Sequence, residues 1–201
     1  MRLTDGLCAF PEDPLAIQIL IQGLESAGKT TMIGKLAEGE IVKKIPTIGL
    51  NVEQFSCRSM SIVARDLGRT HAARSAWKHY YQSTDAIVFV VDSTDHERLD
   101  DAREELAVLL QEKQLRQAAL LVFANKQDLP GAAGVAELSD RLGLHRFLGR
   151  QWSVHASCAH TGEGLCEGFE WLRSALARPR AKAAKGRLDR ILQSMPWLPL
   201  F

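Results

Sequence analysis

Several features that assign chains to special classes are missing from this sequence of 201 residues. It has only four cysteines, and they lack the pairing that metal sites use: Cys8, Cys57, Cys158 and Cys166. Reduced thiols, as in a cytosolic compartment, are therefore the expectation. The formal net charge is only +1, so the overall charge gives no indication of nucleic-acid binding.

Long apolar runs are also absent. No stretch reaches the roughly 18 residues that a membrane-spanning helix needs, and the N-terminus has no basic region followed by an apolar one. The sequence predicts a soluble, cytoplasmic chain that is attached at most to a membrane surface. With 46% hydrophobic residues, its length suits one domain with a full core and modest extensions.

A phosphate-binding loop is the clearest feature that is present. Residues 23–30 read G-L-E-S-A-G-K-T and follow an apolar run typical of a buried strand. Glycines let backbone N–H groups surround phosphates, Lys29 supplies a positive charge, and the Thr30 hydroxyl can ligate Mg²⁺. The alternative is an ordinary glycine-rich turn, which the preceding strand disfavours. The candidate phosphate contacts are Gly23, Leu24, Glu25, Ser26, Ala27, Gly28, Lys29, Thr30 and Thr31.

A second motif, a hundred residues later, predicts the base. Asn125-Lys126-Gln127-Asp128 follows another apolar strand-like run at 119–124. The Asp128 carboxylate can accept two hydrogen bonds from guanine, which adenine cannot donate. The stem of Lys126 can lie over the purine, and Asn125 can join this loop to the phosphate loop. An unremarkable polar turn before Pro130 is the weaker interpretation.

A turn of small residues completes the expected site. Ser157, Cys158 and Ala159 follow the apolar segment 152–155, and their backbone N–H groups can face the guanine O6. Alone, this motif is weak.

The order of elements predicts an α/β fold. Strand-like runs at 16–22, 51–56, 59–64, 86–91, 119–124 and 152–156 alternate with helical stretches at 28–38, 75–82, 98–113, 134–142 and 164–177. This predicts a single doubly wound domain with a mostly parallel, six-stranded sheet, and an antiparallel hairpin at its edge formed by the second and third runs. The motifs fall at the carboxyl ends of strands, where nucleotides bind such sheets.

With these residues assembled, the chain resembles the Ras-like small GTPases, and within them the ADP-ribosylation factor (Arf and Arf-like) family. The similarity covers about residues 16–177, leaving an N-terminal extension at 1–15 and a C-terminal one at 178–201. Its motifs are G-L-E-S-A-G-K-T-T at 23–31, P-T-I-G at 46–49 with N-V-E at 51–53, W-K-H-Y-Y at 77–81, V-D-S-T-D at 91–95 and A-N-K-Q-D-L-P at 124–130.

The resemblance implies roles for residues in the two switch regions. Thr47 is expected to complete Mg²⁺ coordination with Thr30 and to sense the γ-phosphate through its backbone. Asp66 is expected to hold Mg²⁺ through a water, and Gly68 is assigned to the nucleotide site. The family's W-D-V-G-G-Q appears here as R-D-L-G-R-T at 65–70.

These switch II changes predict slow GTP hydrolysis. Arg69 replaces a glycine whose N–H contacts the γ-phosphate, and its Cβ removes conformational freedom. Thr70 is too short to orient the attacking water as the family's glutamine does, although it or His71 could act differently. Arg69 could supply an internal arginine finger, but an exposed side chain on a loop is the favoured interpretation.

The partner surface also departs from the family. Members of the family carry an aromatic cluster that binds effectors. The corresponding positions here are Leu50, Arg65 and Tyr80, so only one aromatic ring remains and different partners are expected. Trp77 and Tyr80 are spaced i, i+3, so packing in the core explains these two aromatic residues equally well.

The two ends give weaker expectations. Arg2 stands where N-myristoylation needs glycine, so this anchor is not expected if Met1 is the true start, and no prenylation box is present. The segment 178–201 is a basic amphipathic stretch with an apolar tip. It can lie on an anionic membrane, dock on a partner, or fold back on the domain.

The sequence suggests three functions. The favoured one is a monomeric, GTP- and Mg²⁺-binding switch in vesicle trafficking, controlled by an exchange factor and a GTPase-activating protein and read by effectors. The second is a non-hydrolysing interaction protein with a structural nucleotide. The third, an ATP-using phosphate-loop enzyme, conflicts with Asp128.

Overall fold

The computed structural model describes residues 17–37, 43–47, 50–57, 60–66 and 81–177, with the backbone alone over most of 43–66. The strands are β1 (Ile17–Gln22), β2 (Lys43–Thr47), β3 (Leu50–Cys57), β4 (Met60–Asp66), β5 (Ala86–Asp92), β6 (Ala119–Asn125) and β7 (Trp152–Ala156). The α-helices are α1 (Lys29–Ala37), α3 (Leu99–Leu110), α4 (Val135–Arg141) and a further one over 165–177. Short 3₁₀ helices are η2 (His96–Arg98), η3 (Lys113–Leu115) and η4 (Leu144–Arg146).

The strands form one sheet in the order β2-β3-β4-β1-β5-β6-β7. Parallel pairs join β4, β1, β5, β6 and β7, whereas β3 is antiparallel to both β2 and β4. The strands β2, β3 and β4 all lie on one side of β1 in the strand order, whereas β5 and the strands after it lie on the other side. The end of β1 is therefore the point at which the strand order reverses, where doubly wound sheets bind ligands.

The strands β5 and β6 are apolar up to their last residue because both faces of the sheet are covered. In β5, for example, Ala86, Val88 and Val90 belong to one buried cluster, while Ile87 and Phe89 belong to the other. Successive side chains of a strand point to opposite faces. A continuous apolar run, such as β5 or β6, is thus what a strand between two helical layers requires.

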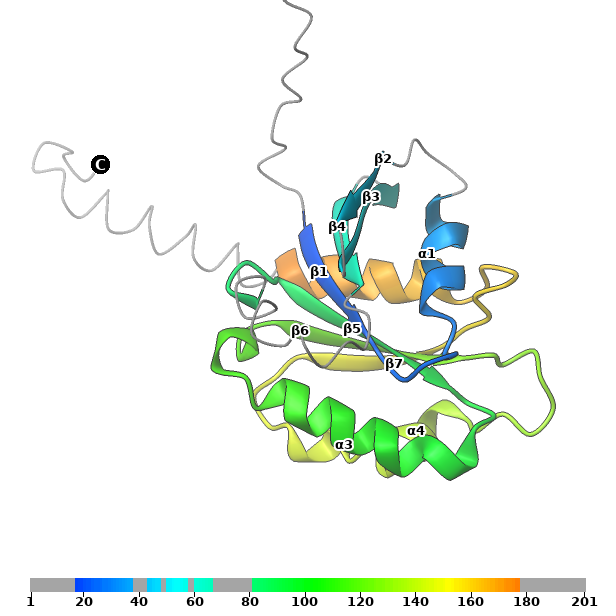
Figure 1. Ribbon diagram of the computed structural model, residues 1–201. Helices are drawn as coiled ribbons and strands as arrows, with labels where there is room; N and C mark the ends of the chain where they lie inside the picture. Colours follow the sequence, from blue (N-terminus) through cyan, green and yellow to red (C-terminus); the bar gives the residue numbers. More distant parts are fainter. Residues whose placement is uncertain (1–16, 38–42, 48–49, 58–59, 67–80, 178–201) are drawn as a thin grey trace, which may run out of the picture.

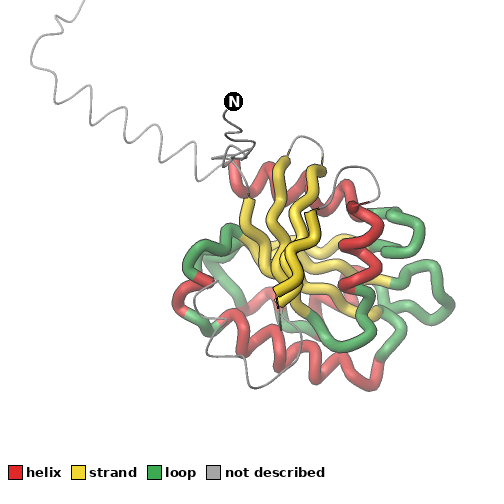
Figure 2. The backbone as a smooth tube through the Cα atoms, turned by 45° about the horizontal axis from the view of Figure 1, so that its top comes forward, coloured by secondary structure: helices red, strands yellow, loops and turns green. Residues whose placement is uncertain are grey.

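Each helical layer buries one apolar stripe. The residues 165–177 and α1 contribute Phe169, Leu172, Met32 and Ile33 to the first cluster, and α3 and α4 pack into the second. Figure 1 shows α1 and the orange helix on one face of the sheet and α3 and α4 on the other. Figure 2 shows the same layering, with the yellow strands between the red helices.

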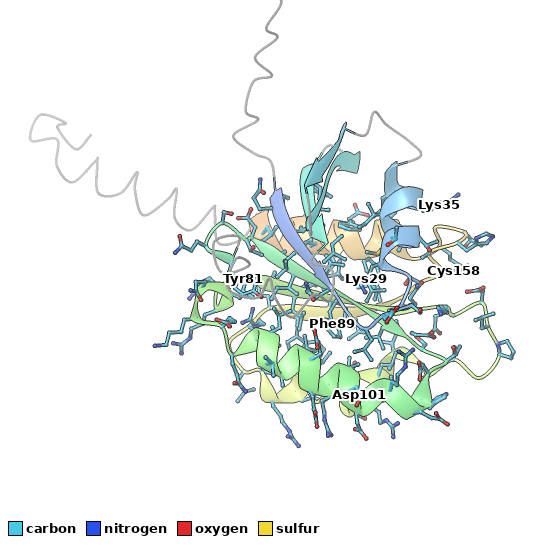
Figure 3. The ribbon with its side chains drawn as sticks, in the orientation of Figure 1. Lys29, Lys35, Tyr81, Phe89, Asp101 and Cys158 are labelled. Carbon is cyan, nitrogen blue, oxygen red and sulfur yellow. The ribbon has the colours of Figure 1, made fainter. Side chains whose placement is uncertain are left out.

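Side-chain directions in α3 follow the helical repeat. Leu99, Ala102, Leu106 and Leu109 recur at helical spacing and are buried, whereas the acidic side chains between them are exposed, or in the case of Glu105 half-buried. Figure 3 shows Phe89 between the sheet and α3 and Asp101 on the far side of this helix. Full burial of a leucine contributes roughly 1.5–3 kcal/mol, so this stripe is a substantial part of the second cluster.

The α/β class, the parallel sheet and the hairpin of β3 and β4 agree with expectation, but the sheet has seven strands and not six. The missed strand is β2, so the hairpin lies one strand inside the edge. Its sequence K-K-I-P-T carries two lysines and a proline, which are not strand signals. An edge strand tolerates them because its outer N–H groups need no partner. Most of the helix expected at 75–82 lies outside the described residues.

Within the described ranges, none of the helices combines the length and the apolar character needed to cross a membrane.

Candidate functional site

The phosphate loop leaves the end of β1 and leads directly into α1. Two glycines permit its path. Gly23 has φ +142°, and a Cβ there would lie 2.1 Å from the Val90 carbonyl oxygen. Gly28 has φ +98°, and its Cβ would lie 2.3 Å from Asn125 Nδ2. Any side chain at either position would clash with a neighbouring strand end, so the loop requires both glycines.

Lys29 is held across this loop. Its Nζ donates to the carbonyl oxygens of Gly23 and Leu24, at 2.9 and 2.8 Å, and Figure 3 shows it at the foot of α1. Thr30 and Thr31 follow on the first turn of the helix and are exposed. An ammonium group, a helix N-terminus and a hydroxyl therefore meet at one loop, which is the donor set that a Mg²⁺-bound phosphate requires.

Asn125 joins three loops that are far apart in the sequence. Its Nδ2 donates to the Ala27 carbonyl oxygen at 2.8 Å, which connects it to the phosphate loop. Its Oδ1 accepts from the Ala159 N–H at 2.8 Å and from the Ser157 hydroxyl at 3.5 Å. The side chain is 2% exposed. The expected link to the phosphate loop is present, and the second link, to the turn at 157–159, was not anticipated.

Lys126 is anchored at its charged end. Its Nζ lies 2.5 Å from Oδ2 of Asp92, the last residue of β5. Asp92 Oδ1 accepts from the Thr94 N–H at 3.0 Å and from its hydroxyl at 2.7 Å. Burial raises the pKa of Asp92, but hydrogen bonds from Lys126 and Thr94 outweigh it and lower the pKa below its ordinary value of 3.8.

A groove runs between these loops. It has a volume of about 260 Å³ and is lined by Gly28, Thr31, Asn125, Lys126, Asp128, Leu129, Cys158, Ala159 and His160. Asp128 is exposed at this groove, so its carboxylate is available to a ligand. Gln127 points the other way and donates from Nε2 to the Ala133 carbonyl oxygen at 2.9 Å. Of these two neighbours, only Asp128 lines this groove.

The turn at 157–159 differs from the expectation in one respect. Its N–H groups already have acceptors: Ser157 donates to the Ala124 carbonyl, Cys158 to that of Glu163, and Ala159 to Asn125 Oδ1. A ligand oxygen would share the Ala159 N–H with Asn125. The next N–H, that of His160, has no backbone acceptor among the described residues, and His160 is one of the residues that line the groove. His160 was not among the site residues expected from the sequence.

The residues expected around Mg²⁺ are only partly described. Thr47 pairs with Leu50, Asn51 pairs with Asp66, and Asp66 pairs with Ile21. This register brings the ends of β2 and β4 to the edge where the phosphate loop begins. The side chains of Thr47 and Asp66 are not described, and Gly68, Arg69 and Thr70 lie outside the described residues.

Two contributors to the site were not assigned from the sequence. Asp92 and Thr94 appeared in the motif V-D-S-T-D only as part of a resemblance. A signal was present, because an acidic residue directly after a buried strand lies at the same edge as the other loops. Its pairing with Lys126 depends on β5 and β6 being neighbours, which the motif alone does not state.

Together, the reversal point of the sheet, the glycine cradle and the groove define a phosphate-loop nucleotide-binding protein with the Ras-like α/β fold. A model of the ADP-ribosylation factor family matches residues 10–176. Among solved structures, the chain is similar to the Arl6 BBS3 small GTPase from Trypanosoma brucei with the bound nucleotide analogue GppNp. The TM-score is 0.70 at 34% identity, covering 81% of this chain and 98% of that one.

The chain belongs to the ADP-ribosylation factor family. Membership in this family implies guanine-nucleotide binding and a general role in the regulation of trafficking.

Proposed function

We propose that this protein is a Mg²⁺-dependent, GTP-binding switch with slow intrinsic hydrolysis that controls vesicle trafficking through effector proteins. The observation that carries the proposal is the pair of bonds from Asn125 to Ala27 and Ala159. These bonds hold the phosphate cradle and the base groove in one unit. A ligand with an anionic end and a purine end fits such a unit.

Guanine is the base that these groups favour. Asp128 supplies an exposed carboxylate for the N1–H and the exocyclic amine, and the His160 N–H is a candidate donor for O6. Lys126 lines the same groove. Adenine lacks the donor pair that Asp128 accepts from.

Mg²⁺ would be held by Thr30 and Thr47, with Asp66 acting through a water. When bound, the ion neutralises charge on the β- and γ-phosphates. Thr30 lies on the exposed first turn of α1 beside Lys29, which supports its part of this set. The strand register supports the location of Thr47 and Asp66 at the same edge.

Nucleotide uptake tests the proposal. Purified protein should carry GDP or GTP, or take up labelled GDP with a Kd of micromolar or below in Mg²⁺ buffer. Lys29→Ala removes the phosphate charge and should weaken uptake by roughly tenfold or more. Leu148→Ala is the control, because Leu148 is 92% exposed and lies outside the groove. A wild-type chain that takes up no guanine nucleotide contradicts the proposal.

Slow hydrolysis is proposed from Arg69 and Thr70, which stand where the family has glycine and glutamine. Single-turnover hydrolysis should therefore rise in Thr70→Gln, and further in the double variant with Arg69→Gly. Unchanged rates would remove these residues as the cause. Arg69→Ala tests the arginine-finger idea, which requires a rate below that of the parent.

A second candidate is a non-hydrolysing interaction protein whose nucleotide is structural. The same two residues favour it, since a switch II without its glycine and glutamine need not respond to the γ-phosphate. Nucleotide-dependent proteolysis within residues 45–81 separates the two candidates.

Partners and location follow from the switch proposal. An exchange factor, a GTPase-activating protein and effectors are proposed, with the protein acting as a monomer in the cytoplasm. The basic segment 178–201 is proposed as a peripheral contact with an intracellular membrane.

A further inference from the structure

A partly buried ion pair lies at the ends of two neighbouring strands, beside the groove. Asp92 ends β5, and Lys126 directly follows β6, whose last residue Asn125 is opposite Asp92 in the parallel register. Their charged atoms are 2.5 Å apart, and the side chains are 13% and 31% exposed. The limited exposure distinguishes this pair from fully solvated ones, whose contribution is usually small.

Asp92 is itself fixed in orientation. Both donors of Thr94 bind Oδ1, which leaves Oδ2 directed at the Lys126 ammonium group. Because hydrogen bonds stabilise the ionised form, Asp92 remains charged at neutral pH. The acceptor that Lys126 meets is therefore both charged and rigid.

Lys126 needs such an anchor. Its φ of +66° lies in the left-handed region, where among the described residues only Ser26 and glycines join it. This conformation is costly for a residue with a Cβ and persists where the surroundings impose it. With its Nζ held by Asp92, Lys126 lines the groove together with Asn125 and Asp128.

We propose that Asp92 is a positioning residue for guanine-nucleotide binding, which it supports by holding the Lys126 stem against the purine face. The inference rests on the proposed function and adds to it a residue outside the nucleotide motifs. Asp92 acts through Lys126 and does not line the base groove itself.

Nucleotide release is the measurement. The dissociation rate of a fluorescent GDP analogue should rise about tenfold in Asp92→Asn, which keeps the shape but removes the charge. Thr94→Val should give a smaller rise, since one of two donors to Oδ1 is lost. Asp100→Asn is the matched control, because Asp100 likewise forms an ion pair, with Arg103 at 3.4 Å, but is exposed on α3. Its rate should equal that of the parent.

A double-mutant cycle separates positioning from general destabilisation. If Asp92 acts through Lys126, Asp92→Asn adds nothing to the release rate of Lys126→Met. If the two rate increases multiply, Asp92 acts by another route and the inference is overturned. Thermal unfolding of the same variants identifies any that fail to fold, and Thr94→Val then carries the test in their place.

A second readout needs no nucleotide. By NMR, the Asp92 carboxyl in the full chain should titrate below 3.8, and its midpoint should move up in Lys126→Met. An unmoved midpoint contradicts the pairing. A wild-type chain that binds no GDP overturns the proposed function, whereas a chain that binds GDP normally with Asp92→Asn overturns the positioning role alone.

Discussion

At the level of single side chains, Asn125 connects the parts of the site, because its amide bonds to both the phosphate loop and the turn at 157–159. The Asn125 amide can take this position because Gly28 has no side chain, which leaves room for Nδ2. Together they explain why a motif at 125–128 and another at 23–30 act as one site.

Gly28→Ala should cost stability and reduce GDP uptake together. It forces a Cβ to within 2.3 Å of Asn125 Nδ2 at φ +98°. Gly131→Ala is the control, because its φ of +78° imposes the same kind of backbone strain with nothing within 4 Å. We expect about 1 kcal/mol from strain in the control and roughly 1–3 kcal/mol more at Gly28 from the clash. Equal losses in chemical denaturation would contradict the role of the Asn125 contact.

Asp128→Asn should change which base binds. An amide presents a donor in place of one carboxylate acceptor, which suits the O2 of xanthine better than the amine of guanine. Competition of GDP against xanthosine diphosphate is the measurement, and the preference should move toward xanthine. Full retention of guanine selectivity would show that Asp128 does not read the base.

His155 should make stability depend on pH. Burial lowers its pKa below 6.5, and the charge of Glu167 only partly opposes this. As the pH falls through 6.5, the unfolded chain binds the proton first, so the folded state loses stability until the folded pKa is passed. Urea unfolding between pH 7.5 and 5 should show this decline, and His155→Gln should reduce it. A slope unchanged in the variant would assign the decline to another group.

The helix over 165–177 packs tightly against β6 at Gly168. A Cβ there would lie 2.5 Å from the Phe123 ring, which also packs against Phe169 with ring centroids 5.8 Å apart. This close approach closes the layer over β6. The core on this face therefore has no room for a methyl group at that position.

Gly168→Ala should destabilise the fold by roughly 1–3 kcal/mol through overpacking. Gly34→Ala is the control in another helix on the same face of the sheet, because its Cβ would meet nothing within 4 Å. The control should stabilise by about 0.5–1 kcal/mol, since alanine loses less entropy in a helix. Thermal unfolding measures both, and a neutral Gly168→Ala would contradict the packing described.

For the molecule as a whole, the question is whether the bound nucleotide, GDP or GTP, changes the conformation of residues 45–81. A switch requires that limited proteolysis within 45–81 differ between GDP and a non-hydrolysable GTP analogue. We expect slower cleavage with the analogue, because contacts to the γ-phosphate order such segments. Lys29→Ala, with weakened nucleotide contacts, should lose the difference. Identical cleavage in both states would favour the non-hydrolysing interaction protein.

Much of this architecture could be read from local patterns. The strands β5 and β6 are apolar runs and β1 is mostly apolar, because both faces of the sheet are covered, and such runs can be recognised from the sequence alone. The loops at 23–30 and 125–128 carry residue types tied to one chemistry. The expectation that they form one site required only that parallel strands end at the same edge.

Other features depended on neighbours that local sequence does not name. The strand β2 exists because Lys43–Thr47 pairs with β3, although proline and lysines argue against a strand. The N–H groups of the turn at 157–159 are engaged by Ala124, Glu163 and Asn125. Asp92 meets Lys126 because β5 lies beside β6.

The sequence by itself determined the α/β class, the phosphate cradle and the base-reading carboxylate, because each depends on residues within one short segment. Only the tertiary structure decided which of those groups remain available to a ligand and which are held by the protein itself. The physical reason is that hydrogen bonds and ion pairs are settled between segments tens of residues apart, once the strands have taken their order in the sheet.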